Sequence, residues 1–436
     1  MVASSTLGIC ILLIPFILLL LLRAPVAFAL GVPSLLYILV TKNVPVMMIG
    51  HRMAGSLFSF VLLALPAFLL SGKMLNTTGV TKRLLDFAIS LVGHLRGGLG
   101  YANALASMMF ATMSGTAIGD AGGLGPVEME IMTKAGYSRE FSAGITAASS
   151  IVGPIIPPSV TLVIYAALAE VSVGRVFMGG LIPGVLLGLS LMTYIYYVAH
   201  YTEEGRSWPI FPRPSFEEVW NSFKRAFLPL LTPVIIVVGI VSGIVTPTEA
   251  AVLAIDYALL LGLVYREVSW KNLWETLEDT VIMTGSIMLI FAVAGMFGWL
   301  VTLENIPTMI NNLILSITTS RAGVILLIDL ALLILGCFLD TTAALLLVTP
   351  VFLPLAIQAG IDPVHLGVTM TCALMLGVIT PPFGICLFVV SDVAELPVAA
   401  VTRASLPYLI PCIITLVLIS VFPEIVLFLP NMIFGT

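Results

Sequence analysis

The chain has 436 residues, of which 59% are hydrophobic and only 9% are charged, and its mean hydropathy is +1.15. A soluble domain carries about 25% charged residues, so the composition excludes an ordinary soluble protein. The formal net charge of −5 is small for this length and does not favour a nucleic-acid partner. Apolar runs of roughly 18 or more residues recur from end to end and predict a membrane protein with several spanning helices.

The first half of the chain opens with an apolar segment at 7–22 that resembles the core of a signal peptide. It lacks a basic start, and a matching segment opens the second half, so we expect it to be retained. A break at Arg23-Ala24-Pro25 follows. The further predicted segments are 26–41, 56–75, an amphipathic stretch at 78–92, a pair at 98–113 and 118–134, a broken segment at 140–168 and a last one at 176–199.

The second half repeats this order after a polar stretch at 201–225, which we interpret as a linker. Its predicted segments are 227–244, 250–265, 280–302, an amphipathic stretch at 307–318, a pair at 322–339 and 343–358, a broken segment at 364–390 and a final one at 405–430. We therefore expect a first repeat at 1–200 (scaffold helices 1–97, hairpin and broken helix 98–200) and a second at 226–436 (scaffold 226–321, hairpin and broken helix 322–436).

Two proline pairs interrupt the broken segments at matching positions. Gly153-Pro154-Ile155-Ile156-Pro157-Pro158 is echoed 224 residues later by Gly377-Val378-Ile379-Thr380-Pro381-Pro382. Proline removes a backbone donor and clashes with the preceding turn, so each helix must open there. Opened backbone survives at membrane depth only where it is buried in protein or lines a cavity. A repeated break of this kind indicates the binding site of a transporter.

Each pair of helical lengths is joined by a very short turn without Lys or Arg, Ser114-Gly115-Thr116 in the first half and Asp340-Thr341-Thr342 in the second. If the pairs cross the membrane fully, each half has six crossings and the repeats are parallel. If each pair is a re-entrant hairpin, each half has five crossings and the repeats are inverted.

The distribution of Lys and Arg decides between these interpretations. With hairpins and the N-terminus outside, 14 of the 18 Lys and Arg fall on the cytoplasmic side, as the positive-inside rule expects. These are Arg23, Lys73, Lys82, Arg83, Arg96, Lys134, Arg139, Arg206, Arg213, Lys224, Arg225, Arg266, Lys271 and Arg403. We therefore predict an all-α polytopic membrane protein with two inverted repeats, each with five crossings, a re-entrant helical hairpin and a broken helix.

The two tips and the two breaks are predicted to form two similar pockets. Hydroxyls and freed carbonyls are hard oxygen ligands suited to Na⁺, and the N-terminal ends of half-helices suit an anion. Two cation sites would then flank one anion site. The residues predicted to contact Na⁺ are Ser114, Gly115, Thr116, Ser150, Gly153, Pro157, Asp340, Thr341, Thr342, Gly377, Thr380 and Pro381; those predicted to contact a solute are Ser114, Thr116, Ser159, Thr342 and Thr380. Alternatively, the small residues only allow tight helix packing.

Asp340 ends a long apolar run, where a carboxylate is costly and usually functional. It can bind an ion, cap the following half-helix through the amides of Thr342 and Ala343, or do both. Asp120 is its counterpart in kind, though not in register.

Other acidic residues receive simpler predictions. Glu128 and Glu130 are expected at the cytoplasmic end of the first hairpin, and Glu249 is expected to cap a helix N-terminus. Asp256 and Asp329 are expected to be buried, without an assigned role.

Catalysis finds little support in the sequence. His-Glu-x-x-His, Gly-x-Ser-x-Gly and Gly-x-x-x-x-Gly-Lys motifs are absent, so transport would be passive or driven by an ion gradient. The four histidines (His51, His94, His200 and His365) fall at segment ends, and the five cysteines (Cys10, Cys337, Cys372, Cys386 and Cys412) are expected to be core residues.

The whole chain resembles the large membrane subunit of the tripartite ATP-independent periplasmic (TRAP) transporters. The resemblance rests on Ser114-Gly115-Thr116-Ala117, Lys134-Ala135-Gly136-Tyr137, the stretch 150–159, Thr246-Pro247-Thr248-Glu249-Ala250, Asp340-Thr341-Thr342 and Ile379-Thr380-Pro381-Pro382. One departure is the arm Ile118-Gly119-Asp120-Ala121-Gly122-Gly123, which is richer in glycine than we expect of the family and leaves the substrate open.

The resemblance implies a Na⁺-coupled importer of the elevator type in the bacterial inner membrane, with both termini periplasmic and no cofactor. Its cargo would be a carboxylate-bearing solute such as a dicarboxylate, a sialic acid or a sugar acid. It would work with a small four-helix membrane subunit, encoded as a separate chain, and with a soluble periplasmic binding protein.

Three other functions remain open. A self-sufficient Na⁺/carboxylate symporter of a related inverted-repeat fold would need no binding protein. A channel would conduct without coupling to Na⁺, and a membrane enzyme would need an acid–base or nucleophile pair that is not visible.

Overall fold

The computed structural model describes residues 6–22 and 24–435, with the backbone alone at Phe60 and at 111–114. Arg23, which the sequence placed in the first break and among the cytoplasmic cations, lies outside the described residues. The described part is helical throughout, without strands. Six of its helices are long and apolar enough to span a bilayer, or seven if Met47–Leu57 and Val61–Thr77 together form one bent span. The predicted all-α polytopic class is confirmed.

The first half contains the predicted helices in the predicted order. They are α1 (Thr6–Leu21), α2 (Val26–Thr41), α3 (Met47–Leu57), α4 (Ala64–Thr77), α5 (Val80–Val92), α6 (Gly98–Ser114), α7 (Ala117–Gly123), α8 (Gly125–Lys134), α9 (Arg139–Ser149), α10 (Val160–Ala169) and α11 (Val173–Tyr201). The segment expected at 56–75 is part of a longer unit that also includes α3 and the 3₁₀ turn η1 (Phe60–Leu63).

The second half follows after the short helix α12 (Glu203–Ser207). Its helices are α13 (Phe216–Val241), α14 (Pro247–Tyr265), α15 (Trp270–Leu303), α16 (Ile306–Ile317), α17 (Arg321–Gly336), α18 (Thr341–Gln358), α19 (Pro363–Val378), α20 (Ile385–Ala394), α21 (Val398–Val421) and α22 (Pro423–Phe434). The final predicted segment is therefore two helices, because Pro423 starts a new one.

Local capping explains where two of the helices begin. The Ser215 hydroxyl accepts from the Glu218 amide, and the Glu218 carboxylate accepts from the Ser215 amide at 2.7 Å. This capping box starts α13 at Phe216, so the last ten residues of the predicted linker 201–225 are helical. Thr246 and Glu249 form the same box at the start of α14, which confirms the predicted capping role of Glu249.

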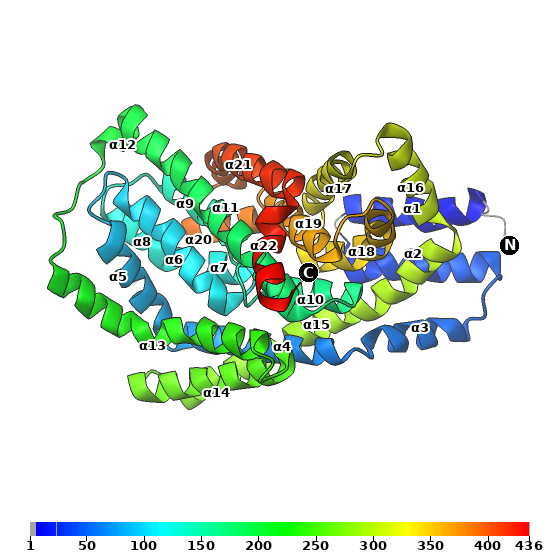
Figure 1. Cartoon of the computed structure of the whole chain (residues 1–436), viewed down its shortest axis with the longest axis horizontal. Helices are drawn as coiled ribbons and strands as arrows, with labels where there is room; N and C mark the ends of the chain where they lie inside the picture. The colour runs from blue at the N-terminus through cyan, green and yellow to red at the C-terminus, as the bar shows by residue number, and fades with distance from the viewer. Residues whose placement is uncertain (1–5, 23, 436) are drawn as a thin grey trace.

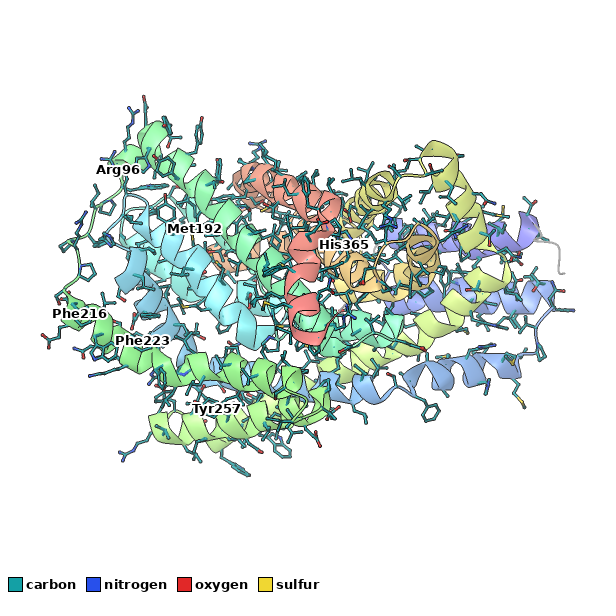
Figure 2. All side chains as sticks on the ribbon, in the orientation of Figure 1. Arg96, Met192, Phe216, Phe223, Tyr257 and His365 are labelled. Atoms are coloured by element: carbon teal, nitrogen blue, oxygen red, sulfur yellow. The ribbon has the colours of Figure 1, made fainter. Side chains whose placement is uncertain are left out.

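The two ends of the long molecule are built from different helices (Figure 1). Near the N-terminus, α1 packs on α2, and the end of α15 packs on α2 and α3. At the opposite end, where Figure 2 labels Arg96, α13 packs on α5 and on α14. Between these ends lie the two hairpins and the two broken helices, with His365 of α19 labelled near the centre.

The long helix α11 covers the first break through its glycines. A Cβ atom on Gly180 would lie 2.5 Å from the carbonyl oxygen of Ile155, and one on Gly184 would lie 2.4 Å from a side-chain carbon of Ile156. Only residues without a side chain allow such an approach of helix to backbone. Part of the small-residue pattern therefore does serve tight packing.

We predict that Gly180→Ala destabilises the protein by about 1–3 kcal/mol, because the new methyl group meets a backbone oxygen that cannot rotate away. Gly298→Ala on α15 is the matched control, since its Cβ would meet nothing closer than 3.9 Å. Alanine there should be neutral or stabilising by up to about 1 kcal/mol. Thermal unfolding of the two variants in the same detergent measures the difference, and equal midpoints would contradict the packing argument.

Candidate functional site

The tip of the first hairpin lies against the first break. Gly115 has φ +60°, and a Cβ there would lie 3.1 Å from the Val160 amide nitrogen and 3.5 Å from the Pro158 carbonyl oxygen. Thr116 is the N-cap of α7, where its hydroxyl oxygen accepts from the Gly119 amide at 3.1 Å. The turn therefore requires glycine for both its conformation and its close contact. The side chain of Ser114 lies outside the described residues.

The first break interrupts the helical pattern between α9 and α10. After the 3₁₀ turn η2 (Ser150–Val152), the chain passes through a cis Pro157–Pro158 bond to Ser159, the N-cap of α10. The Ser159 hydroxyl donates to the Pro154 carbonyl and accepts from the Leu162 amide. All of 150–159 is buried. The Ser159 hydroxyl therefore has no second hydrogen to donate to a ligand.

Asp120 of α7 lies directly at this break. A Cβ on Gly153 would lie 2.1 Å from the Asp120 Oδ2 atom, and Asp120 is only 2% exposed. The sequence named Asp120 as a counterpart of Asp340 but did not include it among the site residues. It lies in the first turn of the half-helix that follows the tip.

The second hairpin also packs closely on the second break, through the end of its first arm. A Cβ on Gly377 would lie 2.5 Å from the Cα atom of Gly336, the last residue of α17. Asp340 is the N-cap of α18, and the Thr342 amide donates to its Oδ2 atom at 3.0 Å. The predicted capping role of Asp340 is confirmed.

The two breaks differ in exposure. The second break also contains a cis bond, between Pro381 and Pro382, and then re-enters a helix at Ile385. Pro381 and Pro382 are exposed and Thr380 is half-buried, whereas Pro157 and Pro158 are buried. Two motifs with the same sequence pattern therefore have different environments.

Helices next to the breaks and tips in the first half pack against helices of the second half. The half-helix α7 packs on α20 of the other half, and α10 packs on α18. The Tyr165 hydroxyl of α10 donates to the Pro363 carbonyl of α19 at 2.6 Å. Cys386 of α20 makes a hydrogen bond with Ser150 and lies within electrostatic range of both Asp120 and Asp340. Residues of both tips and both breaks therefore gather in one region.

Two hydroxyls in this region have already donated their hydrogen atoms to helix carbonyls. The Ser150 hydroxyl donates to Ala147 at 2.8 Å, and the Thr380 hydroxyl donates to Leu376 at 2.7 Å. Each oxygen retains lone pairs that can coordinate a cation. The Asp120 carboxylate lies at the first break, against Gly153, so the chemistry of this region suits a hard cation such as Na⁺.

A buried polar network supports the first hairpin, and the sequence did not predict it. The Asn103 amide donates to Glu128 at 2.7 Å and to Thr146 at 2.9 Å, and its carbonyl oxygen accepts from the Ser149 hydroxyl at 2.8 Å. Ser107 donates to Ser149 at 2.9 Å. The network joins α6, α8 and α9. A polar residue on each of three facing helices was its only signal in the sequence.

Several predictions about acidic residues were wrong or incomplete. Glu128 is 2% exposed and belongs to the network, because it lies on the face of α8 that packs on α6 and α9. Glu130 is exposed and pairs with Lys134. Asp256, expected to be buried, is exposed on α14. Asp329 is buried as expected and accepts from the Ser420 hydroxyl, which links α17 to α21.

Most of the cysteines are core residues, as predicted, and one of the histidines is also buried. Four of the five cysteines are buried and all five are free, while Cys10 is exposed. His365 is buried, and its Nε2 atom lies 2.8 Å from the Ile419 carbonyl oxygen.

The fold and this region define a class of protein, a multi-pass membrane transporter built around broken helices. A profile of the family described as the tripartite ATP-independent periplasmic transporter, DctM component, matches residues 13–425. The sialic acid TRAP transporter large permease protein SiaM of Vibrio cholerae is 43% identical over 412 residues, covering 94% of this chain and 96% of that protein.

Two further similarities agree with the family match. The C4-dicarboxylate TRAP transporter large permease protein DctM of Pseudomonas aeruginosa is 39% identical and covers 92% of this chain and 94% of that protein. The structure of the YdaH transporter of Alcanivorax borkumensis has a TM-score of 0.63 over 94% of this chain and 97% of that chain, at 14% identity, which concerns the fold alone.

The chain belongs to the DctM family, the large permease subunits of TRAP transporters. Members of this family are membrane transport permeases. They work with a small membrane subunit and a periplasmic binding protein.

We predict that Glu128→Ala destabilises the first hairpin by about 1–3 kcal/mol, because one of the two hydrogens of the buried Asn103 amide loses its acceptor while the other still bonds to Thr146. Glu130→Ala is the matched control two residues away on the same helix. It removes only an exposed pair with Lys134, which contributes about 0.3–0.5 kcal/mol. Thermal unfolding compares the two variants, and similar losses would contradict the importance of the network.

Proposed function

We propose that the protein imports a carboxylate-bearing organic solute across the bacterial inner membrane, driven by a Na⁺ gradient. The observation that carries this proposal is the gathering of acidic residues from both halves at the two breaks. Asp120 lies against Gly153 of the first break and Asp340 caps α18 at the second tip, while Ser150 and Thr380 offer hydroxyl oxygens at the two breaks. A cation bound at these groups would offset buried negative charge and satisfy the opened backbone.

The predicted Na⁺ ligands divide into those with free oxygens and those that shape the site. Ser150 and Thr380 offer hydroxyl oxygens, and Asp340 offers a carboxylate that also caps α18. Gly115 and Gly377 serve close backbone contact, so any coordination by these two residues uses their carbonyl oxygens. The remaining predicted ligands, Ser114, Thr116, Gly153, Pro157, Thr341, Thr342 and Pro381, belong to the same tips and breaks.

The substrates for which the relatives are named favour an anionic cargo, and so does the positive charge that bound Na⁺ would bring to the site. The two relatives described above are named for sialic acid and for C4-dicarboxylates, and both substrates carry carboxylates. The N-terminus of α18 is already occupied by Asp340. A negatively charged solute would therefore bind together with the cation, which is the physical basis of coupling. Among the predicted solute contacts, Ser159 is the weakest candidate, because its hydroxyl both donates to the Pro154 carbonyl and accepts from the Leu162 amide.

We further propose that the hairpins and broken helices move as one block against the scaffold helices of each half. The crosswise packing of α7 on α20 and of α10 on α18 joins the two halves of this block. Alternating access requires the two sides of the site to differ in any one state. The buried first break and the exposed second break meet this requirement. In this proposal the repeats are inverted and both termini are periplasmic.

Uptake by the reconstituted complex tests the function. Proteoliposomes should contain this chain and the small subunit, with the binding protein and a labelled acid outside. We expect accumulation only with an inward Na⁺ gradient and with the binding protein present. Uptake by this chain alone would establish a self-sufficient symporter instead, and flux unchanged after collapse of the Na⁺ gradient would indicate a channel.

Two substitutions at Asp340 separate its capping role from ion binding. Asp340→Asn keeps an acceptor for the Thr342 amide but removes the charge, whereas Asp340→Ala removes both. We expect the alanine variant to lose about 1 kcal/mol of stability and the asparagine variant less. Both variants should need much higher Na⁺ for half-maximal uptake. Wild-type Na⁺ dependence in the asparagine variant would limit Asp340 to capping.

A further inference from the structure

A basic cavity lies away from the two breaks, between α5, α13 and the end of α14. It has a volume of about 580 Å³ and is lined by Lys82, Arg83 and Asp86 of α5 and by Lys224 and Arg225 of α13. Four cations and two acids, Asp86 of α5 and Glu267 after α14, give the lining an excess of positive charge. None of these side chains takes part in the proposed transport site.

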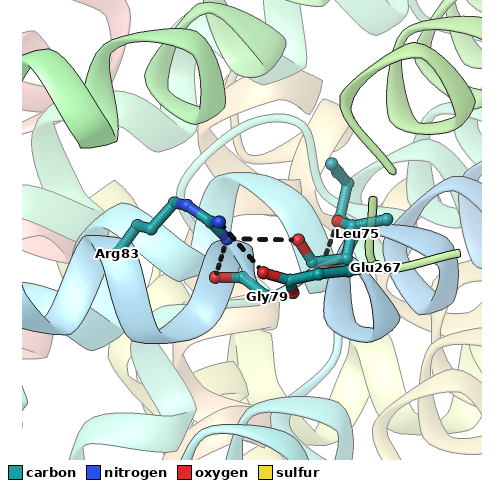
Figure 3. Close-up of polar contacts among 5 residues, drawn as sticks. Leu75, Gly79, Arg83 and Glu267 are labelled. Carbon is teal, nitrogen blue, oxygen red and sulfur yellow. Dashed lines mark hydrogen bonds and ion pairs between the residues drawn. The ribbon is translucent and has the colours of Figure 1, made fainter. Parts of the chain in front are cut away.

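One of the cations holds the wall of the cavity together. The Arg83 guanidinium lies 2.9 Å from the Glu267 carboxylate and donates to the Gly79 carbonyl at 2.8 Å (Figure 3). It also lies 3.7 Å from the centre of the Tyr265 ring. These contacts join the start of α5 to the loop after α14. Because Glu267 neutralises Arg83, this residue is structural and adds little net charge.

The other three cations are available for a ligand. Within the described part of the chain, Lys82, Lys224 and Arg225 form no ion pair, although Asp86 lies one turn after Lys82. All three are exposed at the cavity. With Arg83 paired to Glu267, three cations against Asp86 leave a net charge of +2 on the lining. Such a lining attracts an anion of one or two charges.

The cavity lies where apolar helices change to polar sequence. In α13 the charged residues end at Arg225, and 226–241 contains no charged residue. The apolar run of α14 ends at Tyr265, directly before Arg266 and Glu267. The boundary between hydrocarbon and water therefore crosses both helices at the cavity. Headgroups of membrane lipids occupy this level.

Aromatic side chains on α13 mark the same level. Phe216 and Trp220 are 83% and 46% exposed, and the Trp220 and Phe223 rings stack 5.5 Å apart. Figure 2 shows Phe216 and Phe223 along the outer part of this helix. The Lys224 ammonium lies 5.6 Å from the centre of the Trp220 ring. Aromatic residues of this kind are typical of membrane interfaces, where their rings pack against headgroups and upper acyl chains.

We propose that this cavity binds the phosphodiester headgroup of an anionic membrane lipid, such as phosphatidylglycerol. Lys82 and Lys224 contact the phosphate from opposite walls, Arg225 donates two parallel hydrogen bonds to it, and the acyl chains extend along the apolar part of α13, beginning at Leu228 in the cavity lining. A lipid held in this way ties α5, which leads into the first hairpin, to α13 and α14.

Binding of short-chain lipids to the purified full chain tests this proposal. Dioctanoyl phosphatidylglycerol, dioctanoyl phosphatidylcholine and inorganic phosphate are titrated separately, and binding is followed by native mass spectrometry and thermal stability. We expect phosphatidylglycerol to bind and stabilise the protein and the other two to do so far more weakly. Equal effects of the two lipids would overturn the proposal, and phosphate acting as strongly as phosphatidylglycerol would identify a free-anion site instead.

Substitutions of the lining residues test whether the lipid binds in this cavity. Lys82→Gln, Lys224→Gln and Arg225→Gln should each weaken binding of phosphatidylglycerol about fivefold. Lys271→Gln is the matched control, because Lys271 is 84% exposed and does not line the cavity. The charge-preserving pair Lys82→Arg and Lys224→Arg should retain binding, which separates charge from folding. Unchanged affinity in the glutamine variants would overturn the assignment.

Discussion

The constraint on which this structure depends is the need to satisfy backbone polar groups inside a membrane. Both broken helices open at a proline pair, so each exposes carbonyls and amides that the helix would otherwise have paired. The protein meets this need in three ways: a serine caps the helix after the first break, each hairpin lies against a break, and glycines bring neighbouring backbone close. Ser159 and Gly115 illustrate the first half, and Gly336 and Gly377 illustrate the second. The carbonyl oxygens that lose their helical partners at the breaks reduce stability if they stay unpaired. The same oxygens are suited to bind a cation.

The two halves use related sequences for unequal tasks. The first break is buried beneath the glycine face of α11, and its hairpin is held by the network around Asn103 and Glu128. The second break is exposed at Pro381 and Pro382, and its hairpin tip is held by the cap at Asp340. A transporter needs this inequality, since a site with two identical sides would be open or closed to both compartments at once.

Charge has separate roles at the centre and at the edge of the molecule. At the centre, Asp120 lies against the first break and Asp340 caps α18, so both are carboxylates placed within the helical core. At the edge, Lys82, Lys224 and Arg225 face a cavity at the level where apolar helices end. The first group serves the proposed transport cycle. The second would hold the scaffold in its membrane.

The sequence by itself determined the helical class, the order of the helices, the two breaks and most helix ends, because apolar runs, proline pairs and capping boxes act through neighbouring residues. Asp340 and Glu249 were predicted as caps for this reason, and both are caps. Tertiary structure alone decided the place of Glu128, since burial depends on which face of α8 meets α6 and α9. It also decided that Asp120 reaches Gly153, that Asp256 is exposed and that Cys386 joins the two halves. These are contacts between distant segments, and a local pattern does not specify them because they depend on how whole helices pack.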